Sequence, residues 1–519
     1  MSRINTNVQS LIAQRVLGNN NRSLSVSLER LSTGLRINRG ADDPAGLIGS
    51  ENLRAEKTAL NAAITNAERA EQVVNIAEGG LTEVASLLNE LEGLITTTAN
   101  SAGLSNEEKE ANQLQIDSIL QTIDRVAAST SFQGTRLLNG NFNYTTNNVD
   151  GEVQSFKVNG AKLNFEGTRE VDVVVTNSAQ VGGFFLSFGA ANLDLGTASD
   201  QFTFELAGIE GSRELSFASG TSLTAIADAI NTFTDVTGVE ATVSATGIRL
   251  TSTDVGSAQF VSVKVVDDGG LQTAVGNNVG IYDFDAQDTA TADTGSGVDY
   301  NSTAAGNSLK DDGQDVEATI NGIVATTNGS TVAINTDFLN VEIDLATGAL
   351  GSGGTANSQN LGRVDAFTIT GGGADFQLAG NVDIAGKVSL GIANVAARSV
   401  GRVSSGANTY FLADLAGGKA LNVENGNIAD AQKVVSAAIS EISGLRGRLG
   451  AFQQNTIGAT IRNLGVALEN TTAAESAIRD ADFASETAAL TRSQILVSST
   501  TNVLSIANTQ PQNVLGLLG

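Results

Sequence analysis

The side chains best suited to binding a metal ion gather in one acidic segment, YDFDAQDTATAD. Asp283, Asp285 and Asp288 bring three carboxylates close together in the sequence, and carboxylate oxygens are the ligands that calcium prefers. The segment lacks the central turn glycine and the closing bidentate glutamate of an EF-hand loop. A solvated acidic loop is therefore the default interpretation and calcium binding the alternative. The sequence predicts no resident metal and no other cofactor.

Residue types that much enzyme chemistry requires are missing from the chain. The 519 residues include no His and no Cys. This excludes imidazole general bases, thiol nucleophiles, ordinary zinc sites and disulfides. We therefore predict that the protein is not an enzyme. A carbohydrate-binding domain stays open as a different class, although only 4% of residues are aromatic and a platform that stacks on sugars needs aromatic rings.

The chain is strongly acidic, with a formal net charge of −26. Residues 141–405 contain 11 Lys/Arg and 31 Asp/Glu, a net charge of −20. Such a surface repels phosphates, so we predict no nucleic-acid partner. No segment approaches the roughly 20 apolar residues of a membrane span. The first residues, MSRINTNVQSLIAQRV, lack the continuous apolar stretch of a cleavable signal peptide. We therefore expect neither a membrane partner nor such a signal.

Apolar residues near the N-terminus follow the 3-and-4 spacing of helices that pack together. Asp43-Pro44 is a helix-start signal. An apolar row then recurs every seven residues, at Leu60, Ala67, Val74, Leu81, Leu88 and Ile95. Gly79-Gly80 interrupts this pattern at a cost of about 1 kcal/mol per Gly relative to Ala. Gly103 is predicted to end the helix, and Ser105 with Glu108 predicts a capping box for the next one.

The C-terminal end carries a matching pattern. Asn427 can cap a helix whose apolar rows include Ile442 and Leu449. The two ends therefore predict a long antiparallel coiled-coil bundle. Two further rows lie nearer the termini: Leu24, Leu28, Leu31 and Leu35, which step 4-3-4, and Phe483, Leu490, Val497 and Leu504, which step by seven. A purely intramolecular bundle and contacts between subunits both explain these rows.

The middle of the chain is rich in Gly, Thr and Asp and has the short periodicity of strands. Phe202–Val265 predicts two strands, a short helix over Leu223–Ile230 and two more strands. Glu317–Leu345 predicts a β meander with a turn at Asn328-Gly329, and Asp375–Ile392 predicts a strand pair. The fold class is therefore α+β multidomain: a helical bundle from both termini with an inserted β-rich outer region of one or two domains.

Several sequence strings resemble bacterial flagellin. The start, INTNVQSLIAQRVL…LERLSTGLRINRGADDPAGL, is similar to the N-terminal signature of that family. The end, ENTTAAESAIRDADFASETAALTRSQIL…SIANTQPQNVLGLLG, is similar to its C-terminal signature. The segment IDRVAASTSFQGTRLLNG resembles the flagellin stretch that leaves the first helical hairpin. Phe202–Val265 resembles the "IN" module of some flagellins and hook-associated proteins. Together the terminal matches cover roughly the outer 250 residues.

The resemblance implies a layered organisation. Residues 1–42 and 480–519 would form the terminal helices of an inner tube. Residues 43–165 and 375–479 would form a helical rod with a β section. Residues 166–374 would form the outer region, including an IN-like module over about 200–266. The residues expected to form assembly seams are Leu24, Leu28, Leu31, Leu35, Leu60, Val74, Leu81, Leu88, Ile442, Leu449, Phe483, Leu490, Val497 and Leu504.

The resemblance also implies a function: a subunit that is exported unfolded and polymerises into the extracellular flagellar filament for swimming. Heterologous contacts that do not close generate such an open helical polymer. By family, the partners are copies of the chain itself, hook-junction and filament-cap proteins, an export chaperone and the flagellar secretion system. A hook–filament junction or accessory protein remains the alternative. The long heptad rows and the tail QPQNVLGLLG favour the filament subunit.

Two regulatory regions are implied in the same way. Gly34, Arg36, Arg39 and Gly40 lie between the terminal and rod helices and are candidates for the hinge of filament switching; surface ion pairs explain the two arginines equally well.

A region that animal innate immune receptors recognise in many flagellins corresponds to Leu88 and Leu94. Here Glu90 stands where the family has Arg, and Gln115 replaces an acidic residue. A charge reversed in a complementary interface is unfavourable, so we expect weak or absent receptor activation. A merely solvated Glu90 is the alternative.

Overall fold

A computed structural model describes residues 6–100, 103–163, 167–195, 200–244, 246–271, 279–284, 292–293, 295–346, 359, 361–405 and 408–518, the side chains of 405 and 511–518 excepted. The chain forms two compact units. The first consists of Met1–Glu78, Phe376–Lys387 and Arg446–Gly519, and the second of Gly79–Asp375 and Val388–Leu445.

Long helices occupy both ends of the chain, as the apolar rows predict. They are α1 (Val8–Thr33), α2 (Pro44–Thr98), α3 (Asn106–Ser129), α7 (Ile428–Ala451), α8 (Gly458–Arg479) and α9 (Phe483–Leu518), with a π-helical turn, Phe452–Ile457, between α7 and α8. The predicted start at Pro44 is confirmed. The predicted capping box is confirmed as well: Ser105 Oγ accepts the Glu108 N–H at 3.3 Å, and the Glu108 carboxylate accepts the Ser105 N–H at 2.8 Å.

Helix α2 ends at Thr98, before the predicted Gly103. The last turn contains three successive threonines, whose hydroxyls donate to the carbonyls four residues back at 2.7 to 2.9 Å. Hydroxyls that bond to the helix backbone in this way compete with the regular ladder and weaken it. The prediction from Gly103 alone was wrong because it ignored this local competition.

The apolar rows of the rod helices form their buried faces. In the first unit, Leu60 and Ala63 of α2 pack with Leu464 of α8. Ion pairs flank this contact, with Lys57 Nζ at 2.9 Å from Glu475 and Arg479 Nη1 at 3.1 Å from Glu51. In the second unit, the members that are fully buried include Leu81, Leu88, Leu91 and Ile95 of α2 and Ile116 and Ile123 of α3. The heptad rows therefore correspond to packed helix faces.

The β-rich part of the second unit has two hydrophobic cores. The residues of the first core come from two stretches of the sequence, before and after the second core. This first core lies between the sheets β15-β14-β5-β19-β3 and β16-β17-β18-β4. Its strands are β3 (Tyr144–Asn147), β4 (Val153–Ala161), β5 (Arg169–Asn177), β14 (Glu317–Ile320), β15 (Ile323–Val324), β16 (Thr326–Asn328), β17 (Thr331–Asn335), β18 (Leu339–Leu345) and β19 (Gly362–Gly372). The predicted single meander over Glu317–Leu345 is divided between these two sheets, because the chain crosses from one to the other after β15.

The second core belongs to a module inserted between β5 and β14. Its sheets are β12-β6-β10-β9 and β13-β11-β7-β8. The elements are β6 (Gly183–Phe188), β7 (Gln201–Ala207), β8 (Ser212–Ala218), α4 (Leu223–Asn231), α5 (Thr234–Thr237), β9 (Val239–Ser244), β10 (Gly247–Ser252), β11 (Phe260–Asp267), β12 (Val279–Tyr282), α6 (Thr303–Gly306) and β13 (Leu309–Asp312). The predicted order of two strands, a helix and two strands is confirmed by β7, β8, α4, β9 and β10, but the range Phe202–Val265 also holds the short helix α5 and most of β11, which the prediction lacked.

The inserted module is entered and left at one place. Gln180 and Gln314 face each other as an antiparallel bridge. The Gln180 N–H donates to the Gln314 carbonyl at 2.8 Å, and the Gln314 N–H donates back at 3.0 Å. The two linking segments are thus paired directly before the module begins.

The remaining elements are short: β1 (Ser131–Phe132), β2 (Thr135–Arg136), β20 (Ala374–Gln377), β21 (Lys387–Leu390), β22 (Val403–Ser405), β23 (Asn408–Tyr410) and the 3-10 turn Leu412–Leu415. The last of these is held by α3. The side chain of Gln113, which is buried, donates to the Leu415 carbonyl at 2.9 Å and accepts the Val423 N–H at 2.9 Å. This polar side chain ties the return segment to the helix.

The glycine pair in α2 provides a test of helix packing. A methyl group at Gly79 would meet nothing within 4 Å, whereas one at Gly80 would lie 2.7 Å from Thr130 Oγ1 and 2.8 Å from Leu138 Cδ1. Gly79→Ala should therefore stabilise the helix by about 1 kcal/mol. Gly80→Ala should not stabilise the protein, because the clash of the new methyl group with Thr130 and Leu138 offsets the higher helix propensity of Ala. Urea denaturation followed by circular dichroism compares the two variants, and equal stabilisation by both would contradict this packing.

Candidate functional site

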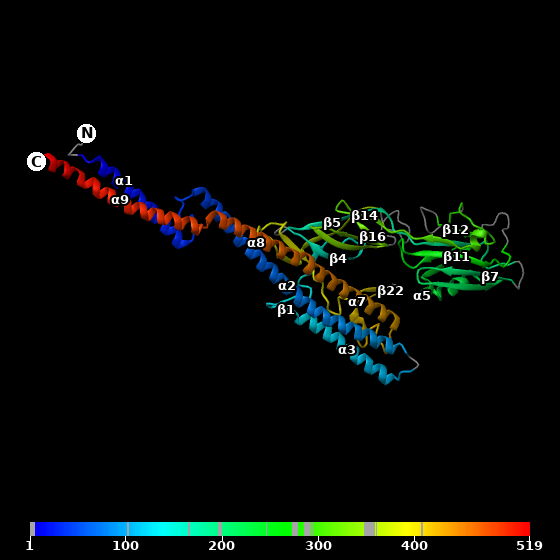
Figure 1. The fold of residues 1–519 in the computed structure, drawn as a ribbon. Helices are drawn as coiled ribbons and strands as arrows, with labels where there is room; N and C mark the ends of the chain where they lie inside the picture. Colours follow the sequence, from blue (N-terminus) through cyan, green and yellow to red (C-terminus); the bar gives the residue numbers. More distant parts are fainter. Residues whose placement is uncertain are drawn as a thin grey trace. The chain divides into compact units, whose positions relative to one another are not determined.

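Helices α1 and α9 run side by side within the first unit (Figure 1). The side chains at the centre of their contact are small. The buried ones are Ser10, Ala13 and Ser27 of α1 and Ser493, Thr500 and Ala507 of α9. Small residues allow two helix backbones to approach closely. The contact between the terminal helices is therefore built from Ser, Ala and Thr and not from Leu.

Hydrogen bonds satisfy the polar groups in this contact. Asn7 Nδ2 donates to the Ala507 carbonyl at 2.7 Å, and Ser10 Oγ donates to the side chain of Asn508 at 2.7 Å. About three turns further along α1, Asn20 Nδ2 donates to Thr500 Oγ1 at 2.8 Å. Each bond joins one residue of the N-terminal segment to one of the C-terminal segment. Such side-chain pairs favour a single register of two helices.

The larger apolar residues of α1 and α9 lie outside the centre of the contact. Ile12 is 45% exposed, Leu28 49%, Phe483 59% and Ile495 64%. The other strongly exposed ones are Val8, Leu11, Val16, Leu496, Val503 and Ile506. Of the predicted seam residues, Leu24, Leu31, Leu35, Leu490, Val497 and Leu504 are half-buried. The apolar rows thus flank the contact, and much of their surface remains free within one chain.

The predicted spacer follows α1 directly. Gly34 ends the helix with φ of 73° and donates its N–H to the Arg30 carbonyl at 2.9 Å. This left-handed conformation favours glycine. Gly40 has no positive φ, and a methyl group there would make an ordinary contact with Leu47 at 3.5 Å. Only the first of these two glycines is required by backbone geometry.

The two connecting segments pair with each other. Leu35 and Asp480 form an antiparallel bridge. The Arg36 N–H donates to the Arg479 carbonyl at 2.7 Å, and the Ala481 N–H donates to the Gly34 carbonyl at 2.9 Å. The Arg36 guanidinium donates twice to the Ile478 carbonyl, at 2.6 and 3.2 Å. Arg36 therefore joins the spacer to the end of α8 through the backbone and not through a surface ion pair.

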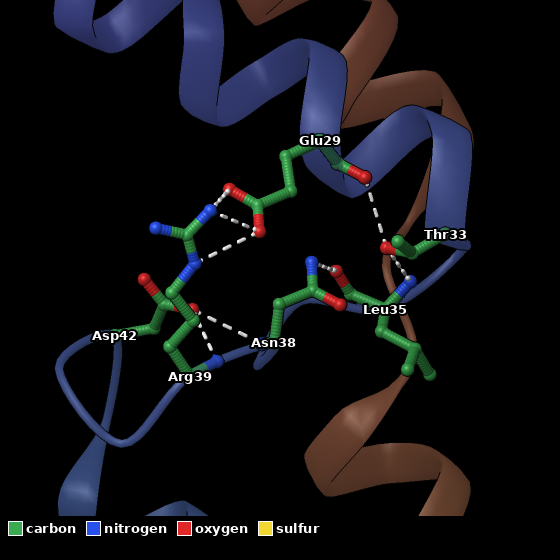
Figure 2. Close-up of polar contacts among 6 residues, drawn as sticks. All are labelled: Glu29, Thr33, Leu35, Asn38, Arg39 and Asp42. Carbon is green, nitrogen blue, oxygen red and sulfur yellow. Dashed lines mark hydrogen bonds and ion pairs between the residues drawn. The ribbon is translucent and has the colours of Figure 1, made fainter.

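Arg39 behaves differently, as Figure 2 shows. Its guanidinium forms a bidentate pair with Glu29, with contacts of 2.8 to 3.1 Å. The Arg39 side chain is 70% exposed, and exposed pairs of this kind contribute only about 0–1 kcal/mol. The alternative of a surface ion pair therefore describes Arg39, whereas the hinge role of the spacer stays a prediction.

Asp42 closes the spacer loop. Its Oδ2 accepts the N–H groups of Arg39 at 2.9 Å and Asn38 at 3.0 Å (Figure 2). These backbone hydrogen bonds lower the pKa of the Asp42 carboxyl below its usual value, and the bond from Arg39 has the larger effect. The charged form of Asp42 is thus the form that holds the loop.

The residues of the receptor region are distributed between core and surface. Leu88 is fully buried in the second unit, so its side chain is inaccessible in the folded chain. Leu94 is half-buried, and Glu90 and Gln115 are exposed. The exposed part of this region therefore consists of the two residues that differ from the family pattern.

Of the three candidate calcium ligands, Asp283 follows β12, whereas Asp285 and Asp288 lie outside the described residues. Burial, followed by the charge of Asp293, raises the pKa of the Asp283 carboxyl. Among the residues that the structure describes, no group of three or more acidic side chains is arranged to hold a metal ion.

Sequence reasoning missed the polar contact between the terminal helices and the pairing of their connecting segments. Asn7, Ser10 and Asn20, which bond to α9, could have indicated this contact. A search for apolar periodicity does not find them, because Ser and Asn are polar. The π-helical turn at Phe452–Ile457 was missed as well. Its sequence, FQQNTI, has no glycine or proline to mark it.

Comparison with known proteins gives three family matches. Residues 4–143 match the bacterial flagellin N-terminal helical region, residues 432–518 match the C-terminal helical region, and residues 201–254 match the flagellin hook IN motif. The chain is 30% identical to a flagellin of Salmonella rubislaw and 27% identical to flagellin B of Helicobacter pylori, with 99% of both chains covered in each case.

In one solved structure, FliC of Burkholderia pseudomallei, the matched part is 12% identical and spans 74% of this chain and 99% of that one, with a TM-score of 0.22. Separately, none of the helices in the described part of this chain is long and apolar enough to cross a membrane.

The spacer geometry predicts the effect of Asp42→Ala. Loss of the carboxylate leaves the amides of Asn38 and Arg39 without their acceptor. Each amide loses the hydrogen bond that protects it, so these amides should exchange with solvent about fivefold faster. Hydrogen exchange of the full-length chain measures this. Glu29→Ala is the matched control, because it removes the exposed ion pair and leaves both amides bonded.

Acid should reproduce the same opening in the unaltered chain. Because the folded-state pKa of Asp42 is lowered, its stabilisation is complete above the unfolded pKa of about 3.9 and is lost as the pH falls through the folded value. Exchange corrected for its intrinsic pH dependence should therefore rise in acid for the unaltered chain and not for Asp42→Ala. An equal rise in both would show that Asp42 does not hold the loop.

Proposed function

Because the chain belongs to the bacterial flagellin family and is a structural subunit of the extracellular flagellar filament, we propose that it polymerises with copies of itself through α1 and α9. The observation that carries this proposal is the exposure of Ile12, Leu28, Phe483 and Ile495 beside a contact made of small residues. Burial of apolar area is the main favourable term in protein association.

Pairing of α1 with α9 leaves apolar surface along both helices. Neighbouring copies that cover this surface would bind through different faces, and such heterologous contacts continue as an open helical polymer. Residues 1–42 and 480–519 would then form the inner tube, residues 43–165 and 375–479 the rod and residues 166–374 the outer region. The further seam residues of α2 and α7, such as Leu60 and Ile442, would stabilise the rod within each subunit.

The remaining steps follow from this role. The chain would be exported unfolded by the flagellar secretion system and with an export chaperone. Its partners would include hook-junction and filament-cap proteins, and it would have no catalytic activity. The absence of Cys supports export in an unfolded state, because no disulfide constrains the chain.

The spacer is proposed as the hinge between tube and rod. Its two segments are joined at Leu35 and Asp480 and by Arg36, so they would move together and not independently. Gly34, with its left-handed backbone, is the point about which α1 would turn.

Apolar contacts between subunits predict the effect of single changes on polymerisation. Ile12→Ser and Ile495→Ser each remove apolar area, and full burial of such a side chain contributes about 1.5–3 kcal/mol. Each should raise the critical concentration for seeded polymerisation by about tenfold. Gln14→Ser is the control, since Gln14 is exposed on the same helix and offers no apolar side chain. Electron microscopy and sedimentation measure the outcome.

A truncated chain lacking residues 1–42 and 480–519 should stay monomeric in the same assay. Filaments from the truncated chain would remove the terminal helices from the assembly mechanism. Short rings from the full-length chain would favour a junction or accessory protein.

We also infer weak or absent activation of innate immune receptors. Glu90 and Gln115 are exposed, so the altered charges lie where a partner would meet them. Glu90→Arg should increase the response of reporter cells to purified protein, because it restores the family charge. Glu83→Arg, at an exposed position of the same helix, should not. Equal responses to both variants would show that Glu90 is only a solvated residue.

A further inference from the structure

The contact between α1 and α9 contains a hollow of about 420 Å³. Its walls include Arg22, Ser23, Ser27 and Arg30 of α1 and Glu486 and Ala489 of α9. The α1 residues recur three and four positions apart, so one helix face forms that wall. Ala489 is too short to fill the space opposite it.

Positive charge exceeds negative charge in this hollow. Arg22 and Arg30 provide two guanidinium groups, and Glu486 provides the single carboxylate of the lining. Arg30 Nη1 lies 3.9 Å from Glu486 Oε2, which is longer than a hydrogen bond. Within the described part of the chain, no carboxylate pairs with Arg22. One positive charge is therefore not balanced by the lining.

One of the arginines that line the hollow also has a donor that is not satisfied. Arg30 Nε is buried and has no hydrogen-bond partner among the residues that the structure describes. A buried donor without a partner is costly. The guanidinium group is planar and presents its donors as a fork that matches a carboxylate or phosphate. An oxyanion in the hollow would balance the positive charge and accept hydrogen bonds from the guanidinium groups that line it.

The surroundings favour an acidic occupant. Helix α1 contains three arginines and one glutamate, and α9 contains one of each. The helix pair is thus basic, whereas the whole chain has a net charge of −26. A basic helix pair of this kind attracts an anion.

We propose that this hollow binds an oxyanion, either a carboxylate presented by a neighbouring copy or a free phosphate-like ion. The proposal rests on the polymerisation proposed above. Binding would lock α1 against α9 only once the two helices are paired, so it would stabilise the assembled state.

The test compares heat depolymerisation of filaments made from the full-length chain and from the Arg22→Gln and Arg30→Gln variants. Each is measured in sodium chloride and in sodium phosphate at equal ionic strength, because salt screens exposed charges. Arg15→Gln is the matched control: it removes the same charge from an exposed position of α1 that does not line the hollow. Filaments from the unaltered chain show that polymerisation itself has not failed.

Two results would support the proposal and separate the sources. A saturable rise of the depolymerisation midpoint in phosphate, weakened about tenfold or more in affinity by either hollow variant, identifies a free oxyanion. A lower midpoint for both hollow variants than for Arg15→Gln, without any effect of phosphate, identifies a carboxylate of a neighbour. Midpoints equal to the control in both salts would overturn the proposal.

Glu486→Gln keeps the proposal testable if the arginine variants do not polymerise. This change removes the competing carboxylate and leaves the two guanidinium groups in place. Filaments of Glu486→Gln should then be stabilised more by phosphate, or by the neighbouring carboxylate, than filaments of the unaltered chain. A lower midpoint with no response to phosphate would show that Glu486 itself is the required partner, which would overturn the proposal.

Discussion

Close packing of α1 against α9 determines which side chains of the two helices stay exposed and can contact other molecules. Two helices that meet through Ser, Ala and Thr approach each other more closely than helices that meet through Leu. Their large apolar residues are then displaced to the flanks, where one chain cannot cover them. Hydrogen bonds such as that of Asn20 with Thr500 keep the polar groups satisfied within the pair. The exposed apolar surface is thus a direct consequence of a small and polar contact.

The spacer transmits this arrangement to the rest of the first unit. A single-stranded linker would let α1 turn freely, but the bridge between Leu35 and Asp480 couples it to the segment that leads into α9. Arg36 adds two hydrogen bonds to a backbone carbonyl. These bonds do not require an exposed carboxylate as a partner. The rod contact of Leu60 with Leu464 then begins on the far side of the spacer from the terminal pair.

Local signals in the sequence located the elements better than they located the contacts. Pro44 and Ser105 start helices because their effects act within one turn, and the rows through Leu81 and Leu88 correspond to buried faces. The position of the spacer was predictable for the same reason. The pairing of Leu35 with Asp480 was not, since those residues are far apart in the chain. The division of Glu317–Leu345 between two sheets likewise depends on long-range partners such as β5 and β4.

The bridge between Gln180 and Gln314 bears on how this chain can change over evolutionary time. The inserted module has its own hydrophobic core, and its entry and exit strands are already paired before it begins. Chain ends that lie together are the condition under which domains are gained, lost or exchanged without disturbing their host. The module can therefore be regarded as a cassette: replacement by a short loop, or by an unrelated domain with adjacent termini, would leave β5 and β14 in register.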